Sequence, residues 1–319
     1  MMQYHGLEAA MLTIYKTTPE GLEIIESVAN GCWINAIDPT PEEIKQLQAW
    51  GIEPELITYS LDLDEMARVE RDEGYTLILL RIPYLQGVDQ DIPYITIPMG
   101  IIIKDNFIAT LCRYPNDISH ILTNGKYRGF KTAKRYRFVL YVLLETATRY
   151  LVYLRDINRA VDNVEDQLQK STRNHELLEL LKYQKCLVYF TTALHSNEVM
   201  MERLQRMKMF NQYEEDEELL EDVLTENQQA IQTTNIETEI LSSMMDAFAS
   251  IISNNLNVVM KALAALTIII NMPTIVASFY GMNVALPGEE HPLAFMTVFG
   301  IALSMTLIAA YIFYKLDWF

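Results

Sequence analysis

Two apolar stretches near the C-terminus decide the fold class: residues 262–280, ALAALTIIINMPTIVASFY, and residues 293–314, LAFMTVFGIALSMTLIAAYIFY. Between Ala262 and Tyr314 the only Asp, Glu, Lys or Arg residues are Glu289 and Glu290. A helix needs roughly 20 apolar residues to cross the hydrocarbon core of a bilayer, and each stretch has that length. A buried core helix is the other interpretation, but two such stretches in succession favour a membrane. We therefore predict two transmembrane helices, at about 262–280 and 293–314, joined by a loop at 281–292.

The charges beside the two spans predict their orientation. Lys261 precedes the first span and Lys315 follows the second, whereas the connection carries Glu289 and Glu290. Because cytoplasmic ends of spans are enriched in Lys and Arg, both termini are expected in the cytoplasm. The N-terminal residues do not show the charged and apolar pattern of a signal peptide. We expect a multi-pass protein of the inner (plasma) membrane with about 260 residues in the cytosol.

The overall charge and the cysteines exclude several classes of protein. The chain of 319 residues has 42 acidic and 25 basic residues, a formal net charge of −17. A nucleic-acid partner is not expected, because binding the phosphate backbone requires Lys and Arg. Cys32, Cys112 and Cys186 lie far apart without a C-x-x-C pair, so we expect buried free thiols rather than a zinc or redox site.

The first 140 residues predict a cytosolic domain with a mixed sheet, because short runs rich in β-branched and aliphatic residues alternate with helical ones. Lys104-Asp105-Asn106 is expected to form a hairpin turn, and Thr40-Pro41-Glu42-Glu43 has the pattern of a helix cap. The expected strands lie at 12–15, 32–37, 76–80, 101–103 and 107–111.

Long helices are predicted next, at 141–256, since residues 138–272 contain no proline or glycine. A break at 171–174 and an acidic run at 214–218 divide this region into three helices, the last running from about Glu217 into the first span. One apolar stripe on the first of them predicts lengthwise packing: Leu154, Ile157, Val161, Val164 and Leu168. The fold class is thus an α+β cytosolic domain, long helices, and a transmembrane domain at 257–319.

Polar residues inside the first span share one helical face. Thr267, Asn271, Thr274 and Ser278 are separated by three or four positions, and the same register continues toward the cytosol through Asp246, Ser250, Ser253, Asn257, Met260 and Ala264. Hydrogen bonds between packed helices are one interpretation. A face of this length, with an amide near mid-membrane, favours a wetted pathway. One chain cannot enclose a pore, so this interpretation requires a homo-oligomer with the first span inside.

Directly after that span comes Tyr280-Gly281-Met282-Asn283, and with this motif the chain resembles the CorA family of magnesium channels and transporters. The resemblance also covers NVVMK at 257–261, MPT at 272–274 and LDLDEMARVE at 61–70, and extends more loosely over nearly the whole chain. It implies a funnel-shaped homopentamer that passes Mg²⁺ passively through the bilayer. Mg²⁺ would be both the substrate and a regulatory ligand, and no other cofactor is implied.

The resemblance also implies roles for single residues. A ring of Asn283 side chains would select hydrated Mg²⁺, Gly281 would permit the turn that aims them inward, and Glu289 and Glu290 would attract cations. Regulatory Mg²⁺ would bind between subunits at Asp222 and at Asp89 or Asp91, with Asp246 as a further candidate. One departure is Asn271, which occupies the place of an apolar constriction, so that Met260 and Leu263 are the remaining apolar candidates for a pore constriction.

Two other functions stay open. A transporter of Zn²⁺, Co²⁺ or Ni²⁺ would have the same architecture, although a pathway without Cys or His favours a hard, hydrated ion. A membrane-anchored sensor or scaffold would have the two spans but would not need the polar face. An enzyme is not expected, since the sequence shows neither a glycine-rich phosphate loop nor a nucleophile-base pair.

Overall fold

The computed structural model describes residues 11–127, 129–170, 174–210, 213–283 and 292–318. The chain divides between Ser242 and Ser243 into two compact units, and we describe each unit by itself. The boundaries expected from sequence at 140/141 and 256/257 stay a prediction. The expected break at 171–174 falls mainly outside the described residues.

A seven-stranded mixed sheet forms the centre of the first unit, in the order β2-β1-β3-β7-β6-β5-β4. The pairing of β3 with β7 is parallel and the other pairings are antiparallel, which confirms the predicted mixed sheet. Lys104, Asp105 and Asn106 connect β6 to β7 as expected. The strands are β1 (Met11–Thr18), β2 (Gly21–Ile24), β3 (Cys32–Ile37), β4 (Arg68–Asp72), β5 (Tyr75–Leu85), β6 (Tyr94–Ile103) and β7 (Phe107–Cys112).

Short helices cover one face of the sheet: α1 (Pro41–Ala49) and α2 (Pro54–Leu61). The predicted cap of α1 is confirmed, because Thr40 and Glu43 form a reciprocal capping box with Pro41 in the first turn. The helix α2 lies very close to β6, where a Cβ added to Gly100 would be 1.8 Å from the Ser60 Oγ. Glycine at position 100 therefore lets the α2 backbone approach the sheet.

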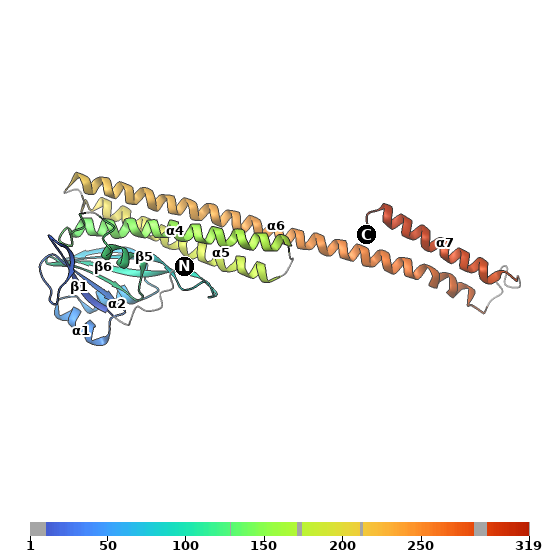
Figure 1. The fold of residues 1–319 in the computed structure, drawn as a ribbon, viewed down its shortest axis with the longest axis horizontal. Coiled ribbons are helices and arrows are strands. Elements are labelled where there is room, and N and C mark those ends of the chain that lie inside the picture. The colour runs from blue at the N-terminus through green and yellow to red at the C-terminus, as the bar shows by residue number, and fades with distance from the viewer. Residues whose placement is uncertain (1–10, 128, 171–173, 211–212, 284–291, 319) are drawn as a thin grey trace. The chain divides into compact units, whose positions relative to one another are not determined.

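Long helices cover the opposite face, as Figure 1 shows. Helices α4 (Arg135–Lys170) and α5 (Asn174–Arg206) lie against the sheet, and the first part of α6 (Glu214–Tyr280) packs on their outer side. The short α3 (Asp117–Thr123) precedes them in the chain. One apolar core joins the sheet to α4, α5 and the first part of α6 through residues such as Phe138, Met201 and Val223. The predicted stripe of α4 is confirmed, since Leu154, Ile157, Val161 and Leu168 are buried.

Two polar contacts fix the alignment of α4 and α6. Arg137 pairs with Asp216 near the start of both helices, and the Nδ2 of Asn158 donates to the Glu237 carboxylate at 2.7 and 2.8 Å. Both pairs are separated by 79 residues, so the two helices run parallel in a single register. Helix α6 begins at Glu214, so the acidic run at 214–218 forms its first turn. The break between α5 and α6 therefore lies before the acidic run and not within it.

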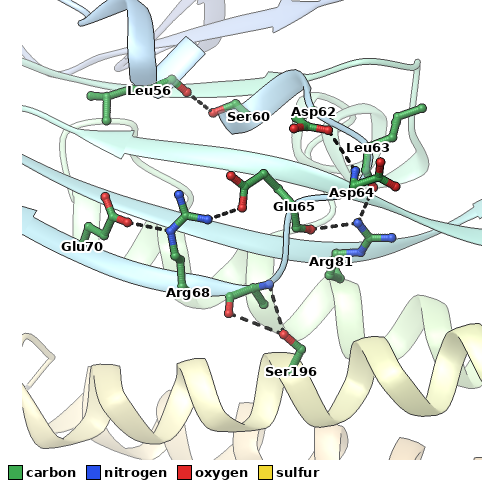
Figure 2. Close-up of polar contacts among 11 residues, drawn as sticks. Leu56, Ser60, Asp62, Leu63, Asp64, Glu65, Arg68, Glu70, Arg81 and Ser196 are labelled. Carbon is green, nitrogen blue, oxygen red and sulfur yellow. Dashed lines mark hydrogen bonds and ion pairs between the residues drawn. The ribbon is translucent and has the colours of Figure 1, made fainter. Parts of the chain in front are cut away.

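Backbone and side-chain contacts hold the segment 61–70 between α2 and β4 (Figure 2). The Arg81 guanidinium donates to the carbonyl oxygens of Leu63 and Glu65 at 2.6 and 2.9 Å, and to the Thr96 carbonyl oxygen at 2.8 Å. Burial lowers the pKa of Arg81, and this effect outweighs the opposing charge of the nearby Asp64. The segment 61–70, which is part of the resemblance described above, thus packs against the sheet.

The second unit contains the last part of α6 and α7 (Ala294–Lys315). Both helices are long and apolar enough to cross a membrane. The α6 helix ends at Tyr280 and α7 begins at Ala294, close to the expected limits of the two spans. Figure 1 shows α7 alongside the C-terminal part of α6.

Candidate ion pathway along α6

All members of the polar face predicted from sequence lie on α6 and are exposed in the single chain. We call the part of this face from Asn257 onward the α6 seam; it consists of Asn257, Met260, Ala264, Thr267, Asn271, Thr274 and Ser278. Leu263, the other apolar candidate, is also exposed and lies at the edge of the seam. The seam is therefore a continuous, uncovered surface of the second unit.

A different face of α6 is covered. Ala265 is fully buried and Val276 is 7% exposed, and Ala262, Ile269 and Met272 on the same face are half-buried. On α7 the less exposed residues also share one face, formed by Ala294, Val298, Ala302, Thr306, Ala309 and Phe313. These two faces meet, because the second unit contains no other long helix among its described residues.

The covered face and the seam point in nearly opposite directions. At about 100° per residue, the mean direction of Ala262, Ala265, Ile269, Met272 and Val276 is about 150° from that of the seam. Helix α7 thus occupies the back of α6 and leaves the seam free for other copies of α6. If α7 had packed on the seam, the polar residues would have been explained as contacts within one chain.

The polar groups of the seam differ in how they are satisfied. The Thr267 hydroxyl donates to the Leu263 carbonyl oxygen of its own helix at 2.7 Å, a common arrangement for threonine in a helix. The Asn271 side chain makes no hydrogen bond within the part of the chain that the structure describes. Pro273 lies inside α6 and has no N–H, so the Ile269 carbonyl lacks its usual donor in the same turn. Among the described residues, this turn therefore contains an amide side chain without a hydrogen-bond partner and a backbone carbonyl without its helical N–H donor.

The Tyr280-Gly281-Met282-Asn283 motif lies at the end of α6. The Gly281 N–H donates to the Ala277 carbonyl oxygen at 2.9 Å, and the Met282 N–H donates to the Phe279 carbonyl oxygen at 3.3 Å. Gly281 does not adopt a positive φ, so a left-handed conformation is not what requires glycine here. A Cβ added at Gly281 would lie 3.2 Å from the Ala277 carbonyl oxygen, and glycine avoids that close contact. Asn283 is exposed.

Not all predicted site residues can be placed. Glu289 and Glu290, expected to attract cations, lie outside the described residues. Asp222 is exposed on α6 in the first unit, Asp89 and Asp91 are exposed between β5 and β6, and Asp246 is exposed on α6 in the second unit. Within the described ranges no three His, Cys, Asp or Glu side chains gather as metal ligands.

Comparison with known proteins now decides the family. A family model described as CorA-like Mg²⁺ transporter protein matches residues 29–315. The chain belongs to the CorA-like Mg²⁺ transporter family. The resemblance seen in Tyr280-Gly281-Met282-Asn283 is thus confirmed, and the chain is a member of a family of membrane transporters.

Relatives of this CorA-like chain match it over most of its length. It is 30% identical to the cobalt/magnesium transport protein CorA of Methanocaldococcus jannaschii over 90% of each chain. The complete structure of the CorA magnesium transporter from that organism superimposes with a TM-score of 0.85, at 26% identity, and covers 98% of this chain and 100% of its own. The soluble domain from the same organism covers 75% of this chain and 97% of its own, with a TM-score of 0.66. The predicted fold class is confirmed.

The side chains that hydrogen-bond the long helices of the CorA-like chain to the sheet were not expected from the sequence. Asn197 on α5 is fully buried and pairs with both backbone polar groups of Arg81, and Tyr150 on α4 donates to the Arg81 carbonyl oxygen. A buried asparagine inside an apolar helix stripe was the available signal. The face that α7 covers had a signal too, because Ala262 and Ala265 on α6, and Ala302 and Ala309 on α7, are small residues at helical spacing.

Proposed function

We propose that this CorA-like protein carries hydrated Mg²⁺ passively across the inner (plasma) membrane through a homopentameric pore lined by the α6 seam. The observation that carries this proposal is the position of α7, which covers the face of α6 nearly opposite the seam. A seam of amides and hydroxyls facing lipid would be costly, since hydrocarbon offers them no hydrogen bonds. Several α6 helices around a common axis place the seam in water instead.

The ligand types fit a hydrated divalent cation. Mg²⁺ gives up its water reluctantly, so an oxygen-lined ring can bind the ion through its hydration shell. The exposed Asn283 side chain after the end of α6 supplies such a ring when copies assemble, and Gly281 allows the chain to stay close to the last turn of the helix. Glu289 and Glu290 would raise the local cation concentration at the outer mouth.

Regulation by cytosolic Mg²⁺ is part of the proposal. Asp222 would bind Mg²⁺ together with Asp89 or Asp91 of a neighbouring subunit, and Asp246 would bind closer to the membrane. The net charge of −17 makes assembled subunits repel one another, so bridging cations favour the compact closed assembly. Both termini lie in the cytoplasm in this arrangement, as the flanking Lys261 and Lys315 favour.

A flux assay on the purified protein tests the function. The protein is reconstituted alone into liposomes, and entry of Mg²⁺, Co²⁺ and Zn²⁺ is compared with that into empty liposomes. We expect Mg²⁺ and Co²⁺ entry without ATP, since relatives carry the name cobalt/magnesium transport protein. Entry of Zn²⁺ in strong preference would favour the zinc transporter, and absence of any flux would favour a sensor or scaffold.

Crosslinking tests the pore. Single cysteines at Thr274 and Ser278 should crosslink between neighbours, and native mass measurement should give five copies. The three natural cysteines are buried and free, so they do not interfere with this test. As a matched control, a cysteine at Phe279, which is 59% exposed but off the seam, should crosslink poorly. A monomer or dimer would contradict the pore.

A further inference from the structure

Asn271 is the strongest unexplained polar group in the membrane part of the protein. It lies in an apolar span whose surrounding positions Ile268, Ile269, Ile270 and Met272 are all apolar. Its side chain is exposed, and it makes no hydrogen bond within the part of the chain that the structure describes. An amide in hydrocarbon needs either a protein partner or water.

Helix α7 does not supply that partner. It covers the face of Ala265 and Val276, whereas Asn271 lies at the centre of the seam on the other side of α6. The Ser304 and Thr306 hydroxyls of α7 donate to carbonyl oxygens of their own helix and not to Asn271. Since no described residue is the partner of Asn271, water, an ion or other copies of the chain are the groups that we expect to satisfy its amide.

The positions one turn away on the same face also carry side-chain oxygen. Thr267 and Thr274 lie four and three residues from Asn271 on the seam, and both are exposed. Three polar side chains in succession make this level of the span wetter than its apolar neighbours. Oxygen and amide groups are also the ligands that suit a hydrated hard cation.

We propose that Asn271 forms a second selectivity ring, which binds the hydration shell of a divalent cation inside the membrane, below the ring of Asn283. This inference rests on the proposed pore. The two rings are 12 positions apart in sequence. Helix α6 continues from Asn271 to Tyr280, and Asn283 follows three residues later. An ion that leaves one ring can thus be received by the next, as conduction through several weak sites requires.

Four variants of the full-length protein in liposomes test the second ring. We expect Asn271→Leu to lower the Mg²⁺ flux at least tenfold, and Asn271→Gln, which keeps the amide, to retain at least a third of it. Asn271→Asp should lower the half-saturating Mg²⁺ concentration at least threefold, because a ring of carboxylates attracts the ion. Ile270→Leu is the matched control in the same turn and should leave the flux unchanged.

Assembly and thermal unfolding are measured for every variant. If the wild type conducts Mg²⁺ and Asn271→Leu conducts it equally well, the second ring is refuted, whereas the proposed pore is not. An unchanged half-saturating concentration for Asn271→Asp also overturns it, since the side chain then does not meet the ion. Absence of flux for the wild type removes the proposed function and this inference with it. The swapped variant Ile270→Asn/Asn271→Leu moves the amide about 100° around the helix; restored flux would show that the seam does not face the pore.

Discussion

The side-chain amide of Asn197 pairs with backbone groups of β5 that no neighbouring strand pairs with. Removing it should lower the free energy of unfolding of the first unit by about 3 kcal/mol. On β5, pairing with β4 ends at Leu79, which lies opposite Arg68. Two residues further along, the Asn197 Oδ1 accepts from the Arg81 N–H at 2.9 Å and its Nδ2 donates to the Arg81 carbonyl at 2.8 Å. The Asn197 side chain of α5 thus makes the two hydrogen bonds that a neighbouring strand would otherwise make with Arg81.

The expected magnitude follows from these contacts. In Asn197→Ala the Arg81 N–H loses the acceptor that the fully buried Asn197 side chain supplies, which costs about 1–3 kcal/mol. The Arg81 carbonyl loses one donor but keeps the Tyr150 hydroxyl at 3.0 Å, which costs about 1 kcal/mol more. Tyr150→Phe should therefore cost only about 1 kcal/mol, because the carbonyl keeps Asn197.

The assay is urea unfolding of a fragment that ends at Ser242, followed by circular dichroism. The first unit ends there, and the soluble domain of a relative, which covers 75% of this chain, has a structure of its own. Thr192→Ala is the matched control on α5, since the Thr192 hydroxyl is exposed and bonds within its own helix; it should cost less than about 0.5 kcal/mol. Equal effects of Asn197→Ala and Thr192→Ala, or a larger effect of Tyr150→Phe than of Asn197→Ala, would refute the reasoning.

Three further predictions concern the mouth, the regulation and the thiols. Asn283→Ala should abolish Mg²⁺ flux in liposomes without changing assembly; an unchanged flux would remove Asn283 from the selectivity ring. Asp222→Ala should weaken the protection that Mg²⁺ gives the cytosolic domain against protease, while Asp222→Lys should mimic a bound cation and keep the flux low. Identical protease patterns with and without Mg²⁺ in the wild type would reject this regulation. Burial raises the pKa of Cys112 and of Cys186 to about 11, and raises that of Cys32 as well. Little thiolate then forms at pH 8, so iodoacetamide should label these residues only after unfolding, and rapid labelling of the folded protein would contradict their burial.

The transporter class could be predicted from the sequence because its signals are local. A helix must satisfy its backbone within itself to cross lipid, so the apolar stretches 262–280 and 293–314 indicate the spans without knowledge of their surroundings. The spacing of Thr267, Asn271, Thr274 and Ser278 follows from the helical repeat in the same way. The capping box at Thr40 and the strand at 32–37 are equally local, and the structure confirms both.

The tertiary structure decided what depends on contacts between distant residues. The parallel pairing of β3 with β7, the common register of α4 and α6, and the role of Asn197 join residues that lie 75 or more positions apart. Nothing in a local pattern selects among the many partners that a buried amide or a strand edge could take. Which face of α6 is covered by α7 likewise depends on a contact between distant residues. The repeat of the sequence shows that the seam is one face, but only the packing of α7 on the opposite side shows that this face is free, because an apolar helix can bury any of its sides against another apolar helix in lipid.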